Sequence, residues 1–166
     1  MRAKFGLGYL PQESSIFLDL TVENNLLGIV ELSATDSQEA SKIVTKLIDD
    51  FGLSKILHTK GRMLSGGQRR KVEIARTLIS SPNLILLDEP FAGIDPIAVE
   101  EIKELLKEIS KKDISILITD HNVRETLSLC DRAIILVDGN IIADGTEQQL
   151  KENEYVSQQY FGKMFS

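Results

Sequence analysis

The sequence has 166 residues, a net charge of −6, 42% hydrophobic and 27% charged residues, which predicts one ordinary globular core. The acidic balance argues against the general basic surface of nucleic-acid-binding proteins. No apolar run approaches the roughly 20 residues that span a bilayer, and the charged N-terminus is followed by no apolar stretch of a signal peptide. The lone cysteine, Cys130, cannot form an internal disulfide. We therefore expect a cytoplasmic protein.

Short apolar runs alternate with helical patterns along the chain, which predicts an α/β fold with a mainly parallel sheet. A first strand is expected at residues 5–10. A mostly helical region, approximately residues 20–80, follows it, and an apolar stripe there predicts a helix that ends at Gly52. A second helix is expected over residues 66–79. Its inward face is predicted to consist of Val72, Ala75, Leu78 and Ile79.

The second half of the chain begins with an unalternating apolar run, residues 84–87, which predicts a strand buried on both faces, and residues 114–118 predict another buried strand. Between these runs, Asp95 as N-cap and Pro96 at the first helical position predict the start of a helix. The inward face of that helix is predicted to consist of Ile97, Val99, Ile102, Leu105, Leu106 and Ile109.

The last third of the chain predicts a helix over residues 123–130 and then a hairpin. The hairpin turn is expected at residues 138–140, since Asp-Gly-Asn favours tight turns between strands. Its strands are expected at residues 133–137 and 141–143. A helical tail of approximately residues 144–166 completes the predicted fold.

Polar side chains directly follow three of the predicted strands: Gln12, the pair Asp88 and Glu89, and His121. Ligands bind at the carboxyl ends of strands in open parallel sheets, so these side chains are expected at one edge. Neighbouring residues of an extended chain point in different directions, so Asp88 and Glu89 can do two jobs. One carboxylate can hold Mg²⁺ and the other can polarise an attacking water. The alternative is a solvated acidic strand end.

Residues 64–68 read Leu64, Ser65, Gly66, Gly67 and Gln68 and open a predicted helix. The N-terminus of a helix binds anions through its unpaired N–H groups and the positive end of the helix dipole. Glycines let the backbone approach a phosphate closely, and the serine adds a hydroxyl donor. The alternative is an ordinary serine-capped helix.

This run is the full signature motif of ABC transporter ATP-binding subunits, and the chain resembles that family from about residue 6 to its C-terminus. The resemblance implies a partial P-loop NTPase core with a helical signature region inserted in it, and it implies ATP and Mg²⁺ as ligands. It gives Asp88 the metal role and Glu89 the role of general base. His121 resembles the switch histidine that contacts the terminal phosphate, while His58 matches nothing.

Two further residues acquire expected roles from the same resemblance. Gln12 resembles the Q-loop glutamine, which reaches Mg²⁺ and reports the nucleotide state to the transmembrane partner. Asp95 resembles the D-loop aspartate of the dimer interface, although helix capping also explains it. The implied partners are a second ATPase subunit, in a head-to-tail dimer with ATP at the interface, and transmembrane permease subunits. The implied location is peripheral, on the inner face of the plasma membrane, with no nucleic acid bound.

Within the family, the pattern is most similar to the ATPases of lipopolysaccharide export, and the ATPases of branched-chain amino-acid importers are the alternative. Soluble ABC proteins of translation or DNA repair are disfavoured because no second signature motif occurs. The export resemblance rests on Gly8–Glu13, Phe91–Pro96, Thr119–Thr126 and Tyr160–Gly162.

The phosphate-binding motif Gly-x-x-x-x-Gly-Lys-Ser/Thr does not occur in the sequence. The resemblance would place it before residue 1, so we expect a chain that starts partway through the domain, as a gene fragment or through a truncated start. Alone, such a chain is expected to be inactive as an ATPase. Two interpretations remain. The chain is part of an ATPase whose phosphate-binding loop is encoded upstream, or it is a binding module that keeps its signature motif without hydrolysing ATP.

Overall fold

The computed structural model describes residues 6–32 and 37–158, with side chains for residues 6–32 and 41–158. The chain divides into two compact units, residues 1–119 and residues 120–166, and each is described by itself.

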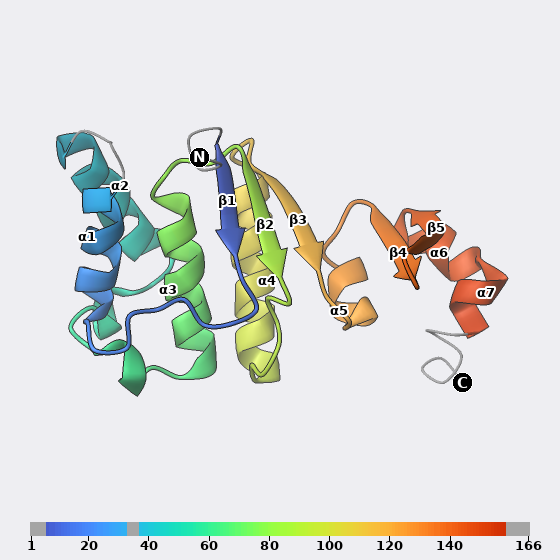
Figure 1. The fold of residues 1–166 in the computed structure, drawn as a ribbon, viewed down its shortest axis with the longest axis horizontal. Helices are drawn as coiled ribbons and strands as arrows, with labels where there is room; N and C mark the ends of the chain where they lie inside the picture. Colours follow the sequence, from blue (N-terminus) through green and yellow to red (C-terminus); the bar gives the residue numbers. More distant parts are fainter. Residues whose placement is uncertain (1–5, 33–36, 159–166) are drawn as a thin grey trace. The chain divides into compact units, whose positions relative to one another are not determined.

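The first unit contains a parallel sheet of three strands (Figure 1). The strands are β1 (Leu7–Leu10), β2 (Leu84–Asp88) and β3 (Ser115–Thr119), in the order β1-β2-β3. The register pairs Leu10 with Leu87 and Asp88 with Thr119. The carboxyl ends of the three strands therefore meet at one edge, and the predicted parallel sheet is confirmed for these strands. Phe5, the first residue of the predicted strand, lies outside the described residues.

The described residues of the first unit also form the helices α1 (Val22–Leu32), α2 (Ser37–Asp50), α3 (Gly66–Leu78) and α4 (Pro96–Ser110). Two short 3₁₀ turns, η2 (Ser54–Ile56) and η3 (Gly61–Met63), lie between α2 and α3. In Figure 1, α4 lies behind the sheet and α3 lies beside β1, between the sheet and the α1–α2 pair. The predicted inward face of α3 is confirmed, because its four residues Val72, Ala75, Leu78 and Ile79 are buried.

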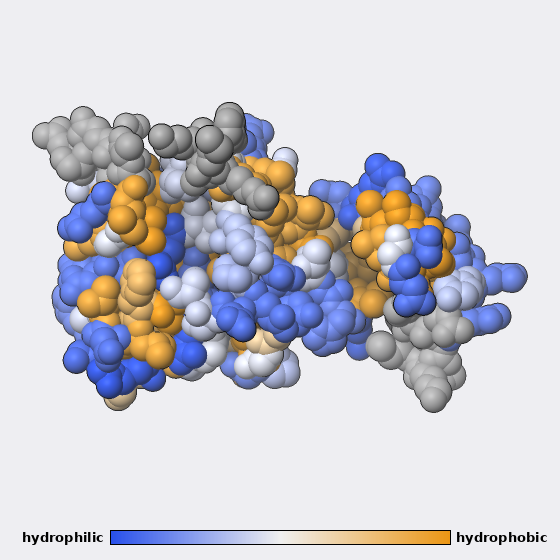
Figure 2. Space-filling view, in the orientation of Figure 1, coloured by the Kyte–Doolittle hydropathy of each residue, from blue (hydrophilic) through white to orange (hydrophobic). Residues whose placement is uncertain are grey.

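The strand β2 is not buried on both faces, and β3 is only partly buried along its length, so both burial predictions are wrong. Ile85 and Leu87 face the helices and are buried, whereas Leu84 is 36% and Leu117 is 56% exposed. The physical reason is that, among the described residues of the first unit, the helices α3 and α4 pack on one face of the sheet (Figure 1). Figure 2 shows hydrophobic surface over β2 and β3 on the uncovered face.

The helix α4 starts as predicted, since the Asp95 side chain caps it and Pro96 is its first residue. Its buried face includes Ala98, Ile102 and Leu106, at the spacing of one helical stripe. Ile97 was expected on this face but is 76% exposed, because it lies five residues before Ile102 and therefore about 140° around the helix from that buried residue.

The core residues of α4 that agree with the prediction are Val99, Ile102, Leu106 and Ile109, while Leu105 is only half-buried. The predicted stop after α2 is also confirmed, because Gly52 adopts the left-handed conformation with φ +61°.

The second unit consists of α5 (Val123–Leu127), a hairpin of β4 (Ala133–Val137) and β5 (Asn140–Gly145), α6 (Glu147–Glu152) and α7 (Glu154–Val156). The strands pair antiparallel, which confirms the hairpin. Its turn residues Asp138 and Gly139 have φ values of +48° and +77°, the conformation that favours Asp-Gly in tight hairpins. The helix predicted over residues 123–130 is shorter, because its C-cap is Ser128.

A small core holds the second unit together and is formed by Leu127, Ile135, Leu150 and Val156. Residues 160–162, which contribute to the resemblance to the lipopolysaccharide export ATPases, lie outside the described part of the chain. No helix among the described residues is both long enough and apolar enough to cross a membrane.

Candidate functional site

Gln12 and Glu89 lie together at the carboxyl edge of the sheet. Gln12 follows β1 after Pro11, and Glu89 follows the last residue of β2. The Gln12 side-chain amide donates a hydrogen bond from Nε2 to Oε2 of Glu89 at 2.8 Å, across 77 residues of sequence. The structure thus brings together two of the side chains that the strand-end pattern predicted to meet.

The backbone of Glu89 adopts an unusual conformation. Its φ is +42°, in the left-handed region that costs a non-glycine residue roughly 1–2 kcal/mol. The Glu89 N–H donates to the carbonyl oxygen of Thr119 at 2.8 Å, which holds this turn against β3. Strain of this kind concentrates at functional sites, and here it directs the chain sharply away at the end of β2.

Asp88 is oriented by hydroxyl groups from both neighbouring strands. Its register partner Thr119 donates from Oγ1 to Oδ1 of Asp88 at 2.7 Å. Tyr9, on β1, places its hydroxyl 3.5 Å from Oδ2, at the limit of hydrogen bonding. Sequence reasoning gave neither Tyr9 nor Thr119 a role in the site, since their approach to Asp88 follows from strand register.

Arg70, in α3, is the main residue that sequence reasoning missed. Its side chain is 6% exposed and donates to four carbonyl oxygens, which no local sequence pattern predicts. Nε donates to Pro90 O at 3.1 Å and Nη1 to Pro11 O at 3.0 Å. Nη2 donates to Asp88 O at 2.9 Å and to Glu89 O at 3.2 Å. A planar guanidinium with five donors can tie these two strand ends to one helix.

The serine of the signature motif caps α3. Ser65 Oγ accepts from the Gln68 N–H at 3.2 Å, and Gln68 Oε1 accepts from the Ser65 N–H at 3.1 Å, a complete capping box. Ser65 therefore does act as an ordinary helix cap, which is the alternative that its sequence position allowed. This arrangement leaves the hydroxyl hydrogen of Ser65 outside the cap, because the cap uses only the oxygen as acceptor. The preceding residue, Leu64, is 5% exposed and anchors the turn.

The glycines of the signature turn pack against the segment that leads into α4. A Cβ on Gly67 would lie 2.4 Å from Cβ of Ala98, and one on Gly66 would lie 3.3 Å from the carbonyl oxygen of Gly93. Asp95 belongs to the same segment, and its Oδ1 accepts from the Ala98 N–H at 3.0 Å. The structure thus places the signature turn beside Asp95's helix start, and Gly67 is required there by helix packing.

His121 belongs to the second unit, as the second residue after the boundary that follows β3. Its side chain is 75% exposed, with Nδ1 3.8 Å from Oδ1 of Asp120. His58, which matched no motif, lies on the surface with Nδ1 3.4 Å from Oε2 of Glu23.

The donor set at the strand ends fits Mg²⁺ that is held together with phosphates. Asp88 offers carboxylate oxygens, and Gln12 offers its amide oxygen, since its Nε2 is the atom that donates to Glu89. Among residues 6–32 and 41–158, no cluster of three or more His, Cys, Asp or Glu forms a metal cage. Mg²⁺ is commonly bound by one or two carboxylates, water and substrate phosphates, and so needs no such cage.

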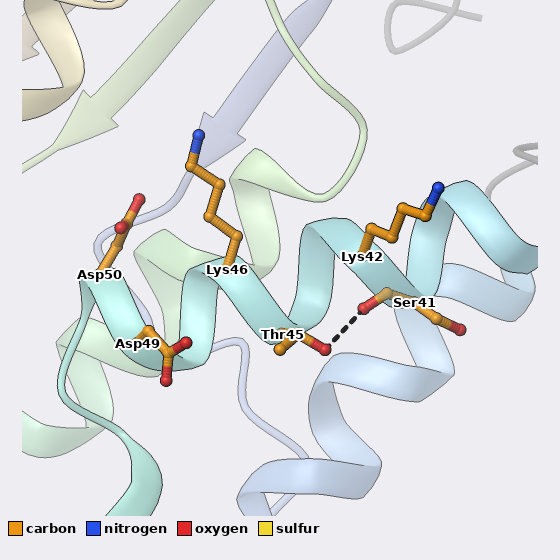
Figure 3. Close-up of a pocket in the computed structure, with 6 residues that line it drawn as sticks. All are labelled: Ser41, Lys42, Thr45, Lys46, Asp49 and Asp50. Atoms are coloured by element: carbon orange, nitrogen blue, oxygen red, sulfur yellow. Dashed lines mark hydrogen bonds between the residues drawn. The ribbon is translucent and has the colours of Figure 1, made fainter.

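An open hollow of about 510 Å³ lies elsewhere, along α2 (Figure 3). All of its lining residues come from that one helix, and the only hydrogen bond drawn among them runs from Thr45 Oγ1 to the Ser41 carbonyl oxygen at 3.0 Å. A hollow lined by one helix face presents no convergent polar groups, so it does not compete with the strand-end site. The lining residues are Ser41, Lys42, Thr45, Lys46, Asp49 and Asp50.

Comparison with known proteins agrees with this architecture. The family described as "ABC transporter" matches residues 2–92. The chain is 49% identical over 166 residues to the lipopolysaccharide export system ATP-binding protein LptB of Haemophilus influenzae, and 44% identical over 165 residues to LptB of Escherichia coli K12. Each alignment covers 99% of this chain and 68% of the relative.

Solved structures give the same result. The ADP-bound ATP-binding cassette MJ1267 of an ABC transporter superposes with a TM-score of 0.83 at 27% identity, over 98% of this chain and 70% of that one. CbiO1 of Clostridium perfringens, part of the transporter complex CbiONQ, superposes with a TM-score of 0.81 at 27% identity, over 97% and 65% of the two chains. The chain therefore belongs to the family of ABC transporter ATP-binding proteins, whose members bind and hydrolyse ATP.

Proposed function

We propose that this chain is the ATP-binding subunit of a transporter that exports lipopolysaccharide, and that its strand-end side chains act in ATP hydrolysis. The observation that carries the catalytic part is the 2.8 Å contact between Gln12 and Glu89, beside the hydroxyl-oriented Asp88. The cargo rests on the 44–49% identity to proteins named for lipopolysaccharide export. An importer of branched-chain amino acids is the alternative cargo system.

Each residue has a distinct proposed role. Glu89 accepts a proton from the attacking water, and Gln12 holds that carboxylate in position through its amide. Asp88, with the oxygen of Gln12, binds Mg²⁺, which neutralises charge on the transferred phosphoryl group when bound. His121 is assigned to the terminal phosphate by family resemblance.

The signature turn and the start of α4 form the second half of the proposed site. In a head-to-tail dimer, the turn from Leu64 to Gln68 acts on the nucleotide of the opposite subunit, with Ser65 as a hydroxyl donor. The N-terminus of α3, a helix of 13 residues, adds the positive end of its dipole. Asp95 lies at the dimer interface, where the capping bond to Ala98 fixes its side chain.

The proposed membrane partner is a permease whose helix docks on the loop after β1. Phe17 and Leu18 in this loop are 47% and 50% exposed, although the Arg76 guanidinium lies 4.8 Å from the centre of the Phe17 ring, so about half of each side chain offers apolar surface to a partner. This partner would place the subunit at the inner face of the membrane. Cysteine crosslinking from position 17 tests the assignment: we expect a product with the permease, and crosslinks to another ATPase chain alone contradict it.

The 166 residues hold no phosphate-binding loop, so we propose that this chain does not hydrolyse ATP by itself. Phosphoryl transfer depends on positioning and charge stabilisation, and that loop supplies the backbone cradle and the lysine for both. Because the signature turn is intact and capped, a mixed dimer with a complete subunit retains one working site. In such a dimer, this chain acts as a binding module.

Equilibrium binding of labelled ATP with Mg²⁺ tests whether the chain needs a complete partner subunit in order to act on nucleotide. We expect no micromolar binding to the purified chain alone and restored binding when a complete family subunit is added. Micromolar binding to the chain alone would refute the proposed role of the missing loop.

A second experiment tests the catalytic and cargo assignments. A phosphate-binding segment of a family member is fused ahead of residue 1, and we call the product the completed chain.

The completed chain is expected to hydrolyse ATP and to support growth of a Haemophilus influenzae strain depleted of LptB. Hydrolysis without rescue would retain the ATPase assignment and remove lipopolysaccharide as the favoured cargo. Absence of hydrolysis in a folded completed chain would contradict the catalytic assignment.

A further inference from the structure

The loop that carries Gln12 is attached to α3 at both of its ends. We define residues 11–15 as the strap. At its start, the Pro11 carbonyl oxygen accepts from Arg70 Nη1 at 3.0 Å, and at its end the Ser15 carbonyl oxygen accepts from Arg76 Nη1 at 2.6 Å. Gln12 lies between these two attachment points, so its backbone position depends on α3.

Glu73 provides the central attachment of the strap. Its Oε1 accepts from Ser14 Oγ at 2.6 Å and from the Ser15 N–H at 2.9 Å. Its Oε2 accepts from Arg70 Nη1 at 3.3 Å. The carboxylate is 3% exposed, so its burial is compensated by these three donors, one of them charged.

Three of the five charged residues of α3 act on one face. Arg70, Glu73 and Arg76 are spaced by three residues, which places their side chains on neighbouring positions of the helix surface. This face contacts the strap through Glu73, and through Arg70 it contacts the carbonyl oxygens of Asp88, at the end of β2, and of Glu89, just after it. Glu73 therefore connects the strap, which carries Gln12, to Arg70, which holds the backbone at Glu89.

We propose that Glu73 is a positioning residue, which holds the strap so that the Gln12 amide stays on the Glu89 carboxylate. This inference rests on the proposed function for the roles of Gln12 and Glu89. Without the Glu73 carboxylate, the strap loses two hydrogen bonds to α3, one from the Ser14 hydroxyl and one from the Ser15 backbone N–H. The Gln12 side chain then samples more positions, and the 2.8 Å contact with Glu89 is occupied for less of the time.

Nuclear magnetic resonance of the whole 166-residue chain, without nucleotide, tests this inference. The probes are the side-chain amide resonance of Gln12, assigned with Gln12→Ala, and the exchange rate of the Ser15 backbone amide. Glu89→Ala supplies the reference position of the Gln12 amide when the contact is lost. In Glu73→Ala we expect the Gln12 amide to move toward that reference and Ser15 exchange to become roughly tenfold faster or more.

A conservative variant and a matched control define specificity. Glu73→Gln keeps one oxygen acceptor for the strap, so it is expected to restore part of the wild-type position of the Gln12 amide. Glu101→Gln is the control. Glu101, in α4, pairs with Lys71 of α3 at 2.5 Å and contacts no strap residue. It is expected to change neither probe.

Two outcomes overturn the inference: a Gln12 amide that keeps its wild-type position in Glu73→Ala, whatever the Ser15 exchange rate, or an equal shift in Glu101→Gln. If Glu73→Ala fails to fold, Ser14→Ala decides, since it removes one bond to the same carboxylate and is expected to shift the Gln12 amide in the same direction. An unmoved amide in that variant likewise overturns the inference. No nucleotide enters the experiment, so its result is independent of the ATP-binding test above.

Discussion

Thr119 and Asp88 face each other across β3 and β2, and the threonine hydroxyl donates to Oδ1 of the aspartate at 2.7 Å. A donor fixed on a neighbouring strand holds the carboxylate in one orientation, and Oδ2, whose contact with the Tyr9 hydroxyl is long at 3.5 Å, can bind a metal ion or its waters. Groups that orient metal ligands in this way commonly affect metal affinity by about 10–100-fold. The first prediction concerns this hydroxyl.

Thr119→Val keeps the shape and β-propensity of the side chain and removes the hydroxyl. In the completed chain, we expect the Mg²⁺ concentration for half-maximal ATP hydrolysis to rise roughly tenfold. Thr119→Ser, which keeps the hydroxyl, is the control and is expected to stay near the wild type. An unchanged Mg²⁺ requirement in Thr119→Val would separate Asp88 from the metal role.

Glu89→Gln removes the proposed base while preserving the shape of the side chain. In the completed chain, ATP binding is expected to remain nearly intact while hydrolysis falls by roughly 10²-fold or more, because proton acceptance by a positioned carboxylate is lost. Phosphate release and equilibrium ATP binding are measured on the same preparation. Near-normal turnover would remove Glu89 from the role of base.

Arg70→Met retains the apolar stem of the side chain and deletes all of its donors. Four carbonyl oxygens and the buried Glu73 lose a partner, so we expect the free energy of unfolding to fall by about 3–5 kcal/mol. Arg62→Met is the matched control: it breaks an exposed pair with Asp19 and should cost about 1 kcal/mol or less. Urea unfolding of both variants measures the difference, and equal losses would contradict the proposed structural role of Arg70.

Gly67→Ala tests the contact between α3 and α4. The added methyl meets Cβ of Ala98 at 2.4 Å, so the helices must separate, and overpacking of this kind costs about 1–3 kcal/mol. Gly28→Ala in α1 is the control, since its methyl meets nothing within 4 Å, and replacing a helical glycine stabilises by roughly 0.5–1 kcal/mol. Unfolding free energies that change in the same direction for both variants would contradict this assignment.

The thiol of Cys130 provides a prediction with a pH dependence. Burial, and secondarily the negative charge of Asp131, raise the pKa of the Cys130 thiol above its ordinary value. Because the thiolate is the reactive form, alkylation by iodoacetamide at pH 7 is expected to be slower in the folded chain than in urea. The difference should narrow as the pH rises through the raised pKa. Faster alkylation of the folded chain at pH 7 would show a lowered pKa instead.

Local features of this protein follow from the sequence alone, because they depend on groups a few residues apart. The cap formed by Asp95 is an interaction within one helical turn, and the Asp138–Gly139 turn depends on residues that adopt positive φ. The buried stripe of α3 follows from helical periodicity. The meeting of Gln12 with Glu89 was also predictable, since both follow strands of one parallel sheet.

Tertiary structure decided the features that join distant segments. No local sequence pattern marks Arg70, yet its side chain donates to carbonyl oxygens 18 to 59 positions away. The apolar run Leu84–Leu87 predicted two covered faces, whereas coverage depends on which elements pack there. Gly67 was assigned to phosphate approach, and only the position of Ala98 shows its packing requirement. Sequence periodicity thus determined the elements and their caps, while long-range packing determined which side chains hold the site together.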